Sequence, residues 1–374
     1  MPLRARASVN LAAIGRNTAR IARAAPSAAV CAVVKADAYG HGMVPVARAA
    51  LGAGATWLAV ATADEAAALR AAGIDAPVLV LGVLSDEELQ IALRAQADVV
   101  AWTEAFVARA AQHGGGRVHV KLDSGMGRLG ERDPARATAV AHAAAATGGV
   151  ELAGLLTHFA TADERGDAFF GEQLNRFRAW ATPLREQYPA AAVHAANSAA
   201  TLRDPASHFD LVRPGVALYG LDPFGEDPAA EGLEPAMELR SYVGEVKACA
   251  AGESVGYGRR FIAAAPTRIA TVPVGYGDGW RRGLTNNAEA LAGGRRFPLV
   301  GTVSMDNVTL DLGPDAGGPG VGEEVVLIGA QGDERILAEE VARRLGTINY
   351  EVTCGISARV PREHHRDGVT VEGP

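Results

Sequence analysis

The sequence predicts an α/β protein in which a (β/α)8 TIM-like barrel is followed by a C-terminal, mostly β domain. Short apolar runs alternate with alanine-rich helical segments over residues 29–212, and eight such runs match the number of strands that closes a barrel. Beyond about Pro228, apolar and polar residues alternate between glycine-rich turns, a pattern typical of antiparallel strands. We therefore expect residues 1–228 to form the barrel and residues 229–374 to form the second domain.

The first predicted element is a helix that begins after Asn10, because Leu11, Ile14 and Ile21 recur at helical spacing. The strands are the apolar runs that follow, and most are separated by segments such as ADEAAALRAAG that favour helices. The runs cover residues 29–34, 57–61, 78–81, 99–102, 118–122, 152–156, 192–194 and 211–212. An open, doubly wound sheet is the alternative, but no run is followed by G-x-G-x-x-G, which favours the barrel.

The second domain is predicted from segments that alternate apolar and polar residues. These segments are MELRSYVGEVKACAAGESVGYG, TRIATVPVGYGDGW, RFPLVGTVSMDNVTLDLG and GEEVVLIG. One helix, near Ala338–Leu345, interrupts the predicted strands.

Composition excludes several classes of function. The net charge of −7 gives no basic footprint for nucleic acid, and no apolar stretch approaches the length of a membrane span. The N-terminus MPLRARASVN lacks the apolar segment of a signal peptide, and the three cysteines lie far apart outside any motif. The histidines have no metal-ligand spacing such as H-E-x-x-H, so no metal site is expected. A cytoplasmic location with reduced thiols is expected.

Polar residues gather where the predicted barrel strands end. In a barrel, the loops after the strands form one catalytic face. The residues that fall there are Lys35, Tyr39, Lys121, Arg128, His158, Asn197, Ser198, Arg213, Gly215 and Val216. Taken singly, most have an ordinary structural interpretation, such as a solvated strand end for Lys35. Their shared position indicates a site.

This pattern of residues suits a phosphorylated aldehyde. Barrel enzymes often bind phosphate in the loops after strands seven and eight, where Ser198 and Gly215 are small enough for close approach. A lysine at the tip of the first strand, Lys35, can form a Schiff base with an aldehyde. Pyridoxal 5′-phosphate has both groups.

Nine motifs in sequence order resemble those of the bacterial alanine racemases. They are VVKADAYGHG, KLDSGMGRLG, THFATAD, NSAATL, VRPGVALYG, SVGYGRRF, VPVGYGDGW, GTVSMDNVTLDL and GTINYEVTC. The resemblance covers both predicted domains. It implies a pyridoxal-phosphate-dependent isomerase that interconverts L- and D-alanine, supplies D-alanine for peptidoglycan and works as a homodimer. One departure is Ser304, which stands where many members have cysteine.

The resemblance also implies roles for individual residues. Lys35 is similar to the lysine that carries the cofactor and serves as one catalytic base, and Tyr257 to the second base, which reaches the neighbouring subunit's site. The predicted cofactor-binding set is Lys35, Tyr39, His158, Asn197, Ser198, Arg213, Gly215, Val216 and Tyr350. Within this set, Arg213 matches the arginine that faces the pyridine nitrogen. Arg128 and Met305 match substrate-binding residues, and Lys121 matches a lysine that is often carbamylated.

Three other functions stay open at this point. A racemase of serine or of larger basic amino acids would use the same scaffold. A non-catalytic pyridoxal-phosphate carrier would need only the barrel and no second base at Tyr257. A decarboxylase with a barrel and a β domain would lose the carboxylate that Arg128 is expected to hold.

Overall fold

The computed structural model describes residues 4–315 and 317–371, which fold into two compact units. The barrel unit contains Ile14–Ala38 and Gly42–Leu218, and the β unit contains Met1–Ala13, Tyr39–His41 and Tyr219–Pro374. None of the described helices is long and apolar enough to cross a membrane. The two units are described separately below.

The barrel unit contains an eight-stranded sheet in which all the paired strands are parallel. Its strands are β2 (Ala29–Val33), β3 (Trp57–Val60), β4 (Val78–Val80), β5 (Asp98–Ala101), β6 (Gly116–Lys121), β7 (Val150–Leu156), β8 (Ala192–His194) and β9 (Leu211–Val212). They lie in the order β8-β7-β6-β5-β4-β3-β2-β9. The two end strands are joined by hydrogen bonds from Asp210 N to Val193 O (2.9 Å) and from Arg213 N to Ala196 O (2.8 Å). The predicted barrel is therefore confirmed.

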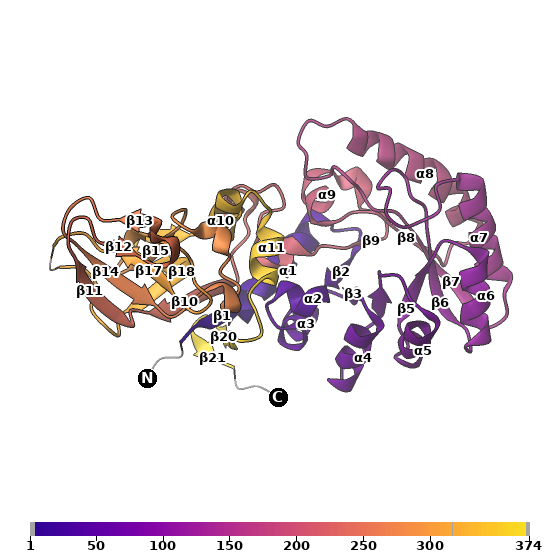
Figure 1. The fold of residues 1–374 in the computed structure, drawn as a ribbon. Helices are drawn as coiled ribbons and strands as arrows, with labels where there is room; N and C mark the ends of the chain where they lie inside the picture. The colour runs from indigo at the N-terminus through magenta and orange to yellow at the C-terminus, as the bar shows by residue number, and fades with distance from the viewer. Residues whose placement is uncertain (1–3, 316, 372–374) are drawn as a thin grey trace. The chain divides into compact units, whose positions relative to one another are not determined.

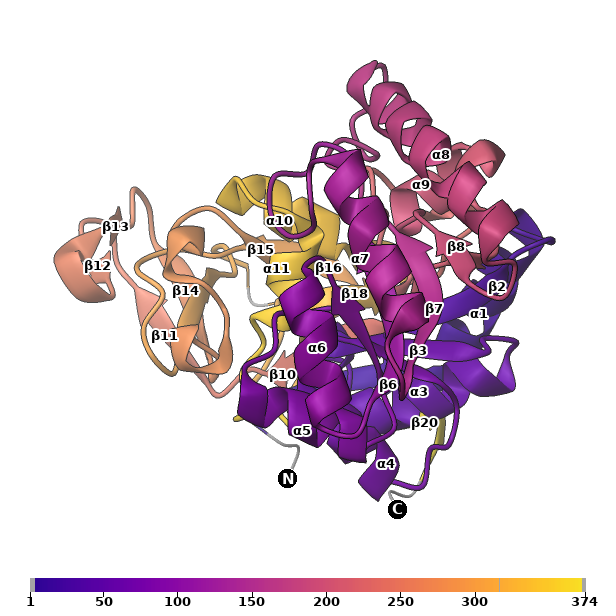
Figure 2. The ribbon, with the colours of Figure 1, turned by 90° about the vertical axis from the view of Figure 1, so that its right-hand side faces the viewer.

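Helices lie outside the strands of the barrel (Figures 1 and 2). They are α1 (Leu11–Ala24), α2 (Lys35–Tyr39), α3 (Met43–Gly52), α4 (Ala63–Ala71), α5 (Asp86–Arg94), α6 (Glu104–Gln112), α7 (Pro134–Ala146), α8 (Phe169–Gln187) and α9 (Ser198–Arg203). The helix predicted after Asn10 begins there, since its side chain accepts a hydrogen bond from Ala12 N over 3.0 Å. Thr62 and Ser85 begin α4 and α5 with capping boxes.

The described residues of the β unit form three sheets. The largest has the order β16-β15-β18-β10-β1-β20-β21 with β19 paired to β18, the second is β11-β14-β17, and the third is the pair β12-β13. The strands are β1 (Arg6–Asn10), β10 (Met237–Tyr242), β11 (Glu245–Cys249), β12 (Ser254–Val255), β13 (Phe261–Ile262), β14 (Thr267–Val272), β15 (Glu289–Ala292), β16 (Arg295–Pro298), β17 (Val308–Asp311), β18 (Glu324–Gln331), β19 (Glu334–Ile336), β20 (Arg362–Arg366) and β21 (Val369–Thr370). A second domain rich in β-strands is confirmed.

Among the described residues, two helices, and not the single one expected, lie between β19 and β20 of the β unit. The predicted helix is α10 (Ala338–Leu345), and a second, α11 (Asn349–Cys354), comes shortly after it. The sequence NYEVTC does not predict the helix α11, because its β-branched residues favour strands as much as helices. The expectation of one helix was therefore wrong.

The first strand of the chain belongs to the β unit. Residues of β1 pair antiparallel with β10 and parallel with β20. The side chains of Ala7 and Val9 are fully buried, whereas the alternate residues Arg6, Ser8 and Asn10 are partly exposed. The two units therefore divide the chain differently from the expected boundary after residue 228, because the β unit also includes the chain up to Ala13, Tyr39–His41 and the residues from Tyr219 onward.

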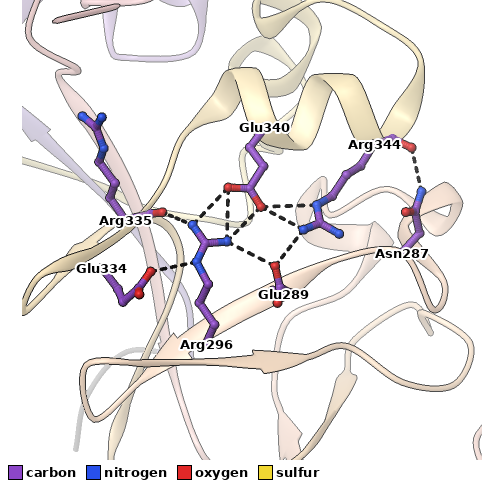
Figure 3. A network of polar contacts seen from close by, with 7 residues as sticks. All are labelled: Asn287, Glu289, Arg296, Glu334, Arg335, Glu340 and Arg344. Atoms are coloured by element: carbon purple, nitrogen blue, oxygen red, sulfur yellow. Dashed lines mark hydrogen bonds and ion pairs between the residues drawn. The ribbon is translucent and has the colours of Figure 1, made fainter. Parts of the chain in front are cut away.

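An ion-pair network connects α10 to the strands of the β unit (Figure 3). Arg296 on β16 contacts Glu334 (2.9 Å), Glu340 (3.0 Å) and Glu289 (3.2 Å). Arg344 on α10 contacts Glu289 (2.7 Å) and Glu340 (3.0 Å) as well. Hydrogen bonds to Glu340 above all raise the pKa of Arg296. Shared carboxylates of this kind stabilise more than isolated surface pairs do.

Candidate active site

Lys35 opens a left-handed turn directly after the first barrel strand. The four residues that follow it, 36–39, all have φ between 51° and 54°. This conformation costs L-residues about 1–2 kcal/mol each, so the surroundings must hold it. The amide of Ala36 donates to Glu65 Oε1 over 2.6 Å, and Asp37 Oδ1 accepts from Met43 N over 2.7 Å. Lys35 therefore starts from a backbone that is held in one conformation.

Four cationic side chains converge on the same rim of the barrel. Lys121, at the end of β6, is only 6% exposed. Burial, together with the positive charges of Arg213, Arg128 and Lys35, lowers the pKa of Lys121 to about 8, against a smaller opposing effect of Asp123. Lys121 therefore loses its proton more readily than an ordinary lysine does.

The loop that carries Arg128 is organised by Asp123. The Asp123 carboxylate accepts hydrogen bonds from the amides of Gly125 (3.1 Å) and Gly127 (3.0 Å) and from Arg132 Nε (3.1 Å). These donors hold the pKa of Asp123 below its usual value despite partial burial. Arg128 itself is exposed, with its side chain available to a ligand.

Arg213 is buried just beyond β9, and its guanidinium donates to several groups. Nη1 contacts His194 Nδ1 (2.7 Å), and Nη2 donates to the carbonyls of Thr157 (2.7 Å) and Ala195 (3.0 Å). Burial lowers the pKa of Arg213 to about 10, which still leaves it charged at neutral pH. His158 Nδ1 lies 3.5 Å from Nη2. Burial, with the charge of Arg213 second, holds the pKa of His158 well below its usual value, so its ring is neutral.

The loops after β8 and β9 are joined by Ser198. Its hydroxyl oxygen accepts hydrogen bonds from the amides of Gly215 (2.9 Å) and Ala217 (3.3 Å). Val216 is buried at the start of a 3-10 turn, Val216–Tyr219. Asn197 caps α9, since its Oδ1 accepts from Ala200 N over 3.0 Å. These residues lie where the sequence predicts, although in this structure Asn197 serves the helix.

In the β unit, three tyrosines form a cluster. The ring of Tyr39 lies 4.9 Å from that of Tyr219 and 5.9 Å from that of Tyr350. Burial raises the pKa of Tyr39, which therefore keeps its phenolic proton. Two further predicted residues, Tyr257 and Met305, are exposed by 74% and 52%.

Sequence reasoning missed several residues that shape this site. Glu65 and Asp123 support the turn after Lys35 and the loop of Arg128. His194 contacts Arg213, and His119 contacts His194 over 2.8 Å. The signal available was a histidine inside an apolar strand in VHVK and AAAVH, which does not reveal its partner. Partners of this kind depend on tertiary structure.

The residues of the barrel unit fit pyridoxal 5′-phosphate. Lys35 supplies an amine for the aldehyde, and Arg213 supplies N–H donors that do not give up their proton. The positive charges of Lys121 and Arg128 suit an anionic carboxylate or phosphate. Ser198 and Gly215 connect the two loops after β8 and β9, where barrel enzymes often bind phosphate.

Comparisons with known proteins agree with this interpretation. The family profile described as "Alanine racemase, N-terminal domain" matches residues 9–223, and "Alanine racemase, C-terminal domain" matches residues 236–364. The alanine racemase of Frankia casuarinae is 44% identical over 373 residues, covering 97% of this chain and 96% of the relative.

Solved structures are similarly close. The alanine racemase from Streptomyces coelicolor has a TM-score of 0.90 at 39% identity, covering 96% of this chain and 97% of that one. The alanine racemase from Bacillus anthracis with bound L-Ala-P has a TM-score of 0.90 at 39% identity, covering 100% and 98%. Since both family profiles and a relative of this similarity span most of its length, the chain belongs to the alanine racemase family.

Proposed function

We propose that this protein is an isomerase that interconverts L-alanine and D-alanine with pyridoxal 5′-phosphate as its cofactor. The observation that carries the proposal is the position of Lys35 at the end of the first barrel strand, on the rim where Lys121, Arg128 and Arg213 gather. Family membership supplies the reaction, and this rim supplies groups suited to it. A racemase of another amino acid on the same scaffold is not favoured.

Inverting an amino acid at Cα requires a proton carrier on each face of that carbon. When bound, pyridoxal phosphate withdraws electrons from Cα and makes its proton removable. The amine of Lys35 takes or returns the proton on one face, that of D-alanine. The hydroxyl of Tyr257 serves the opposite face, that of L-alanine. General acid–base groups of this kind each contribute about 10²–10⁴-fold to a rate.

Arg128 and Lys121 act together on the substrate carboxylate in this proposal. The neutral amine of Lys121 can add to carbon dioxide, which gives a carbamate and releases a proton. The pKa of about 8 makes that amine available, and the resulting negative charge would hold the guanidinium of Arg128. Met305 of the partner subunit is proposed to bound the space for the substrate side chain.

The remaining predicted residues hold the cofactor. With the cofactor bound, Arg213 would donate to the pyridine nitrogen and keep its own proton, which would limit electron withdrawal and so disfavour transamination. His158 lies next to Arg213 with a neutral ring. Ser198, Gly215 and Val216 are proposed for the phosphate, as are Tyr39 and Tyr350, and Asn197 supports this set by capping α9.

A substrate panel tests the proposed reaction. Purified protein loaded with pyridoxal phosphate is given each enantiomer of alanine, serine, lysine and arginine, while racemisation and carbon dioxide release are followed. The proposal expects alanine to be racemised in both directions and no carbon dioxide to be released. Faster racemisation of serine or lysine, or release of carbon dioxide, would contradict it.

We also propose that the enzyme is a homodimer in which each site takes Tyr257 from the partner subunit. The exposure of Tyr257 (74%) and Met305 (52%) supports this, as does that of Ile348 (58%), because such side chains are usually covered in an assembly.

Hybrid dimers test the shared site. Lys35→Ala and Tyr257→Phe are each expected to be inactive on their own. In a hybrid dimer one site has both defects and the other has none. Because half of the randomly mixed dimers are hybrids, mixing after dissociation should restore about a quarter of wild-type activity. No recovery, together with demonstrated hybrids, would mean that both bases come from one subunit.

The proposed cellular role is to supply D-alanine for peptidoglycan from the cytoplasm. Cys31, Cys249 and Cys354 form no disulfide with one another, which suits a reducing compartment. Growth of a strain that lacks the gene, with and without added D-alanine, tests this role.

A further inference from the structure

A chain of hydrogen bonds runs from Arg213 through the barrel interior to Asp98. Arg213 Nη1 lies 2.7 Å from His194 Nδ1, and His194 Nε2 lies 2.8 Å from His119 Nδ1. His119 Nε2 in turn lies 2.9 Å from Asp98 Oδ2. Both histidines are completely buried, and Asp98 and Arg213 are nearly so. We call these four residues the Asp98–Arg213 relay.

Every hydrogen bond of the relay is donated in the direction from Arg213 to Asp98. This follows from the chemistry of the two end residues. An arginine only donates, so Nδ1 of His194 must accept and the ring proton must lie on Nε2. That proton is donated to Nδ1 of His119, which places the proton of His119 on Nε2 as well. The carboxylate of Asp98, which only accepts, ends the relay. Both rings are therefore neutral and in the same tautomer.

The relay crosses the barrel from one rim to the other. Asp98 is the first residue of β5, whereas His194 is the last residue of β8 and Arg213 follows β9. Parallel barrel strands all begin at one rim and end at the opposite, catalytic one. On its outer side Asp98 accepts from Arg117 Nε (3.1 Å), a half-exposed side chain that also pairs with Glu151.

The barrel makes specific room for this relay. A Cβ on Gly154 of β7 would lie 2.2 Å from His119 Nδ1, so any other residue would occupy the place of the ring. Trp57 packs edge-on against His119, with ring centroids 5.8 Å apart. The His119 ring is thus fixed on two sides as well as by its two hydrogen bonds.

We propose that Asp98 is a positioning residue for Arg213, because it fixes the tautomers of His119 and His194 and thereby the orientation of the guanidinium. Without an acceptor at residue 98, the His119 proton can move to Nδ1. The N–H groups at Nδ1 of His119 and Nε2 of His194 would then face each other, and neither would have an acceptor. This inference rests on the proposed function only for the contact of Arg213 with the cofactor. The tautomers themselves are a property of the protein alone.

Nitrogen NMR of the ring nitrogens tests the inference directly. Full-length holoenzyme labelled with ¹⁵N-histidine is compared as wild type, Asp98→Leu and Glu151→Gln, the last a matched control that removes a carboxylate from Arg117 but not from the relay. We expect protons on Nε2 of both rings in the wild type and in the control. Asp98→Leu should shift the signals of His119 and of the more distant His194.

Two outcomes would overturn the inference. One is a wild-type His119 or His194 with its proton on Nδ1, which needs no variant to observe. The other is an unchanged His194 signal in folded Asp98→Leu. If that variant does not fold, Gly154→Ala interrupts the relay at His119 and should change the His194 signal in the same way; an unchanged signal there would count equally against the proposal.

A kinetic measurement separates this inference from the proposed function. Asp98→Leu should lower kcat for alanine about 10-fold with little change in KM. Removing residues that hydrogen-bond to metal ligands lowers activity by a similar factor. The absorption spectrum of the bound cofactor should change with it. If the wild type does not racemise alanine, the proposed function fails although the NMR result stands. If it does and Asp98→Leu matches Glu151→Gln in both spectra and kcat, the positioning role fails.

Discussion

The amide of Ala36, the residue directly after Lys35, donates a 2.6 Å hydrogen bond to the carboxylate of Glu65. The other oxygen of Glu65 accepts from the amides of Ala61 (2.8 Å) and Thr62 (3.2 Å), where it completes the capping box of α4. One carboxylate thus connects a helix N-terminus to the left-handed turn that begins at Lys35. The strain of that turn is held in part by this contact.

Replacing Glu65 should therefore impair catalysis as well as stability. We expect Glu65→Ala to lose about 1 kcal/mol of stability through the cap and to lower kcat about 10-fold or more, because Lys35 is no longer held in position. Glu65→Gln keeps one acceptor and should be intermediate. Steady-state kinetics and thermal unfolding measure both effects.

The chain offers a matched control for this prediction. Glu88 completes the capping box of α5 in the same way, with Ser85 N donating to it over 2.8 Å. Glu88→Ala should lower the Tm and leave kcat unchanged. Equal kcat values for Glu65→Ala and Glu88→Ala would mean that Glu65 is only a helix cap.

Lys121 should make the unmodified protein less stable at neutral pH. Its pKa is about 8 in the fold and 10.5 ordinarily, so the unfolded chain takes up the proton first as the pH falls. The free energy of unfolding therefore decreases as the pH falls from 10.5 to about 8. Below pH 8 the full decrease, on the order of 3 kcal/mol, is present.

Lys121→Met should consequently raise the Tm at pH 7 in buffer free of carbon dioxide, and the gain should shrink toward pH 10. Scans of Tm against pH measure this, with the exposed Lys247→Met as the control. A gain for Lys121→Met that does not depend on pH would contradict the assigned pKa. Activity should fall in this variant, since the amine that forms the carbamate is lost.

Arg213 should keep the ratio of transamination to racemisation low. Arg213→Glu should lower kcat at least about 10²-fold, as the loss of a preorganised donor does, and raise the ratio of transamination to racemisation. Arg213→Lys keeps a positive charge and should keep that ratio low. Pyruvate formation measured beside D-alanine formation gives the ratio; an unchanged ratio in cofactor-loaded Arg213→Glu would refute this role.

Much of the barrel could be predicted because its strands are buried on both faces and read as continuous apolar runs. The strand of residues 6–10 could not, since only Ala7 and Val9 are buried and its partners β10 and β20 lie more than 200 residues away. The turn after Lys35 was also out of reach, because alanine, aspartate and tyrosine do not favour positive φ.

Part of the candidate site could likewise be predicted from the sequence. Side chains such as Arg213 and Lys121 follow from their place at strand ends, which the barrel brings to one rim. Their supporting partners do not, because His194, His119 and Asp98 come from different strands and meet only when the barrel closes.

Reduction of the enzyme with bound cofactor is the simplest way to test the site itself.

Lys35 is the residue proposed to hold pyridoxal phosphate, and its role can be tested directly because the chain contains three lysines, Lys35, Lys121 and Lys247. The protein is incubated with pyridoxal phosphate, reduced with borohydride, digested and analysed by mass spectrometry. We expect visible absorption before reduction and the cofactor mass on the peptide of Lys35 alone. An unlabelled Lys35, or a label on Lys121 or Lys247 in its place, would contradict the account.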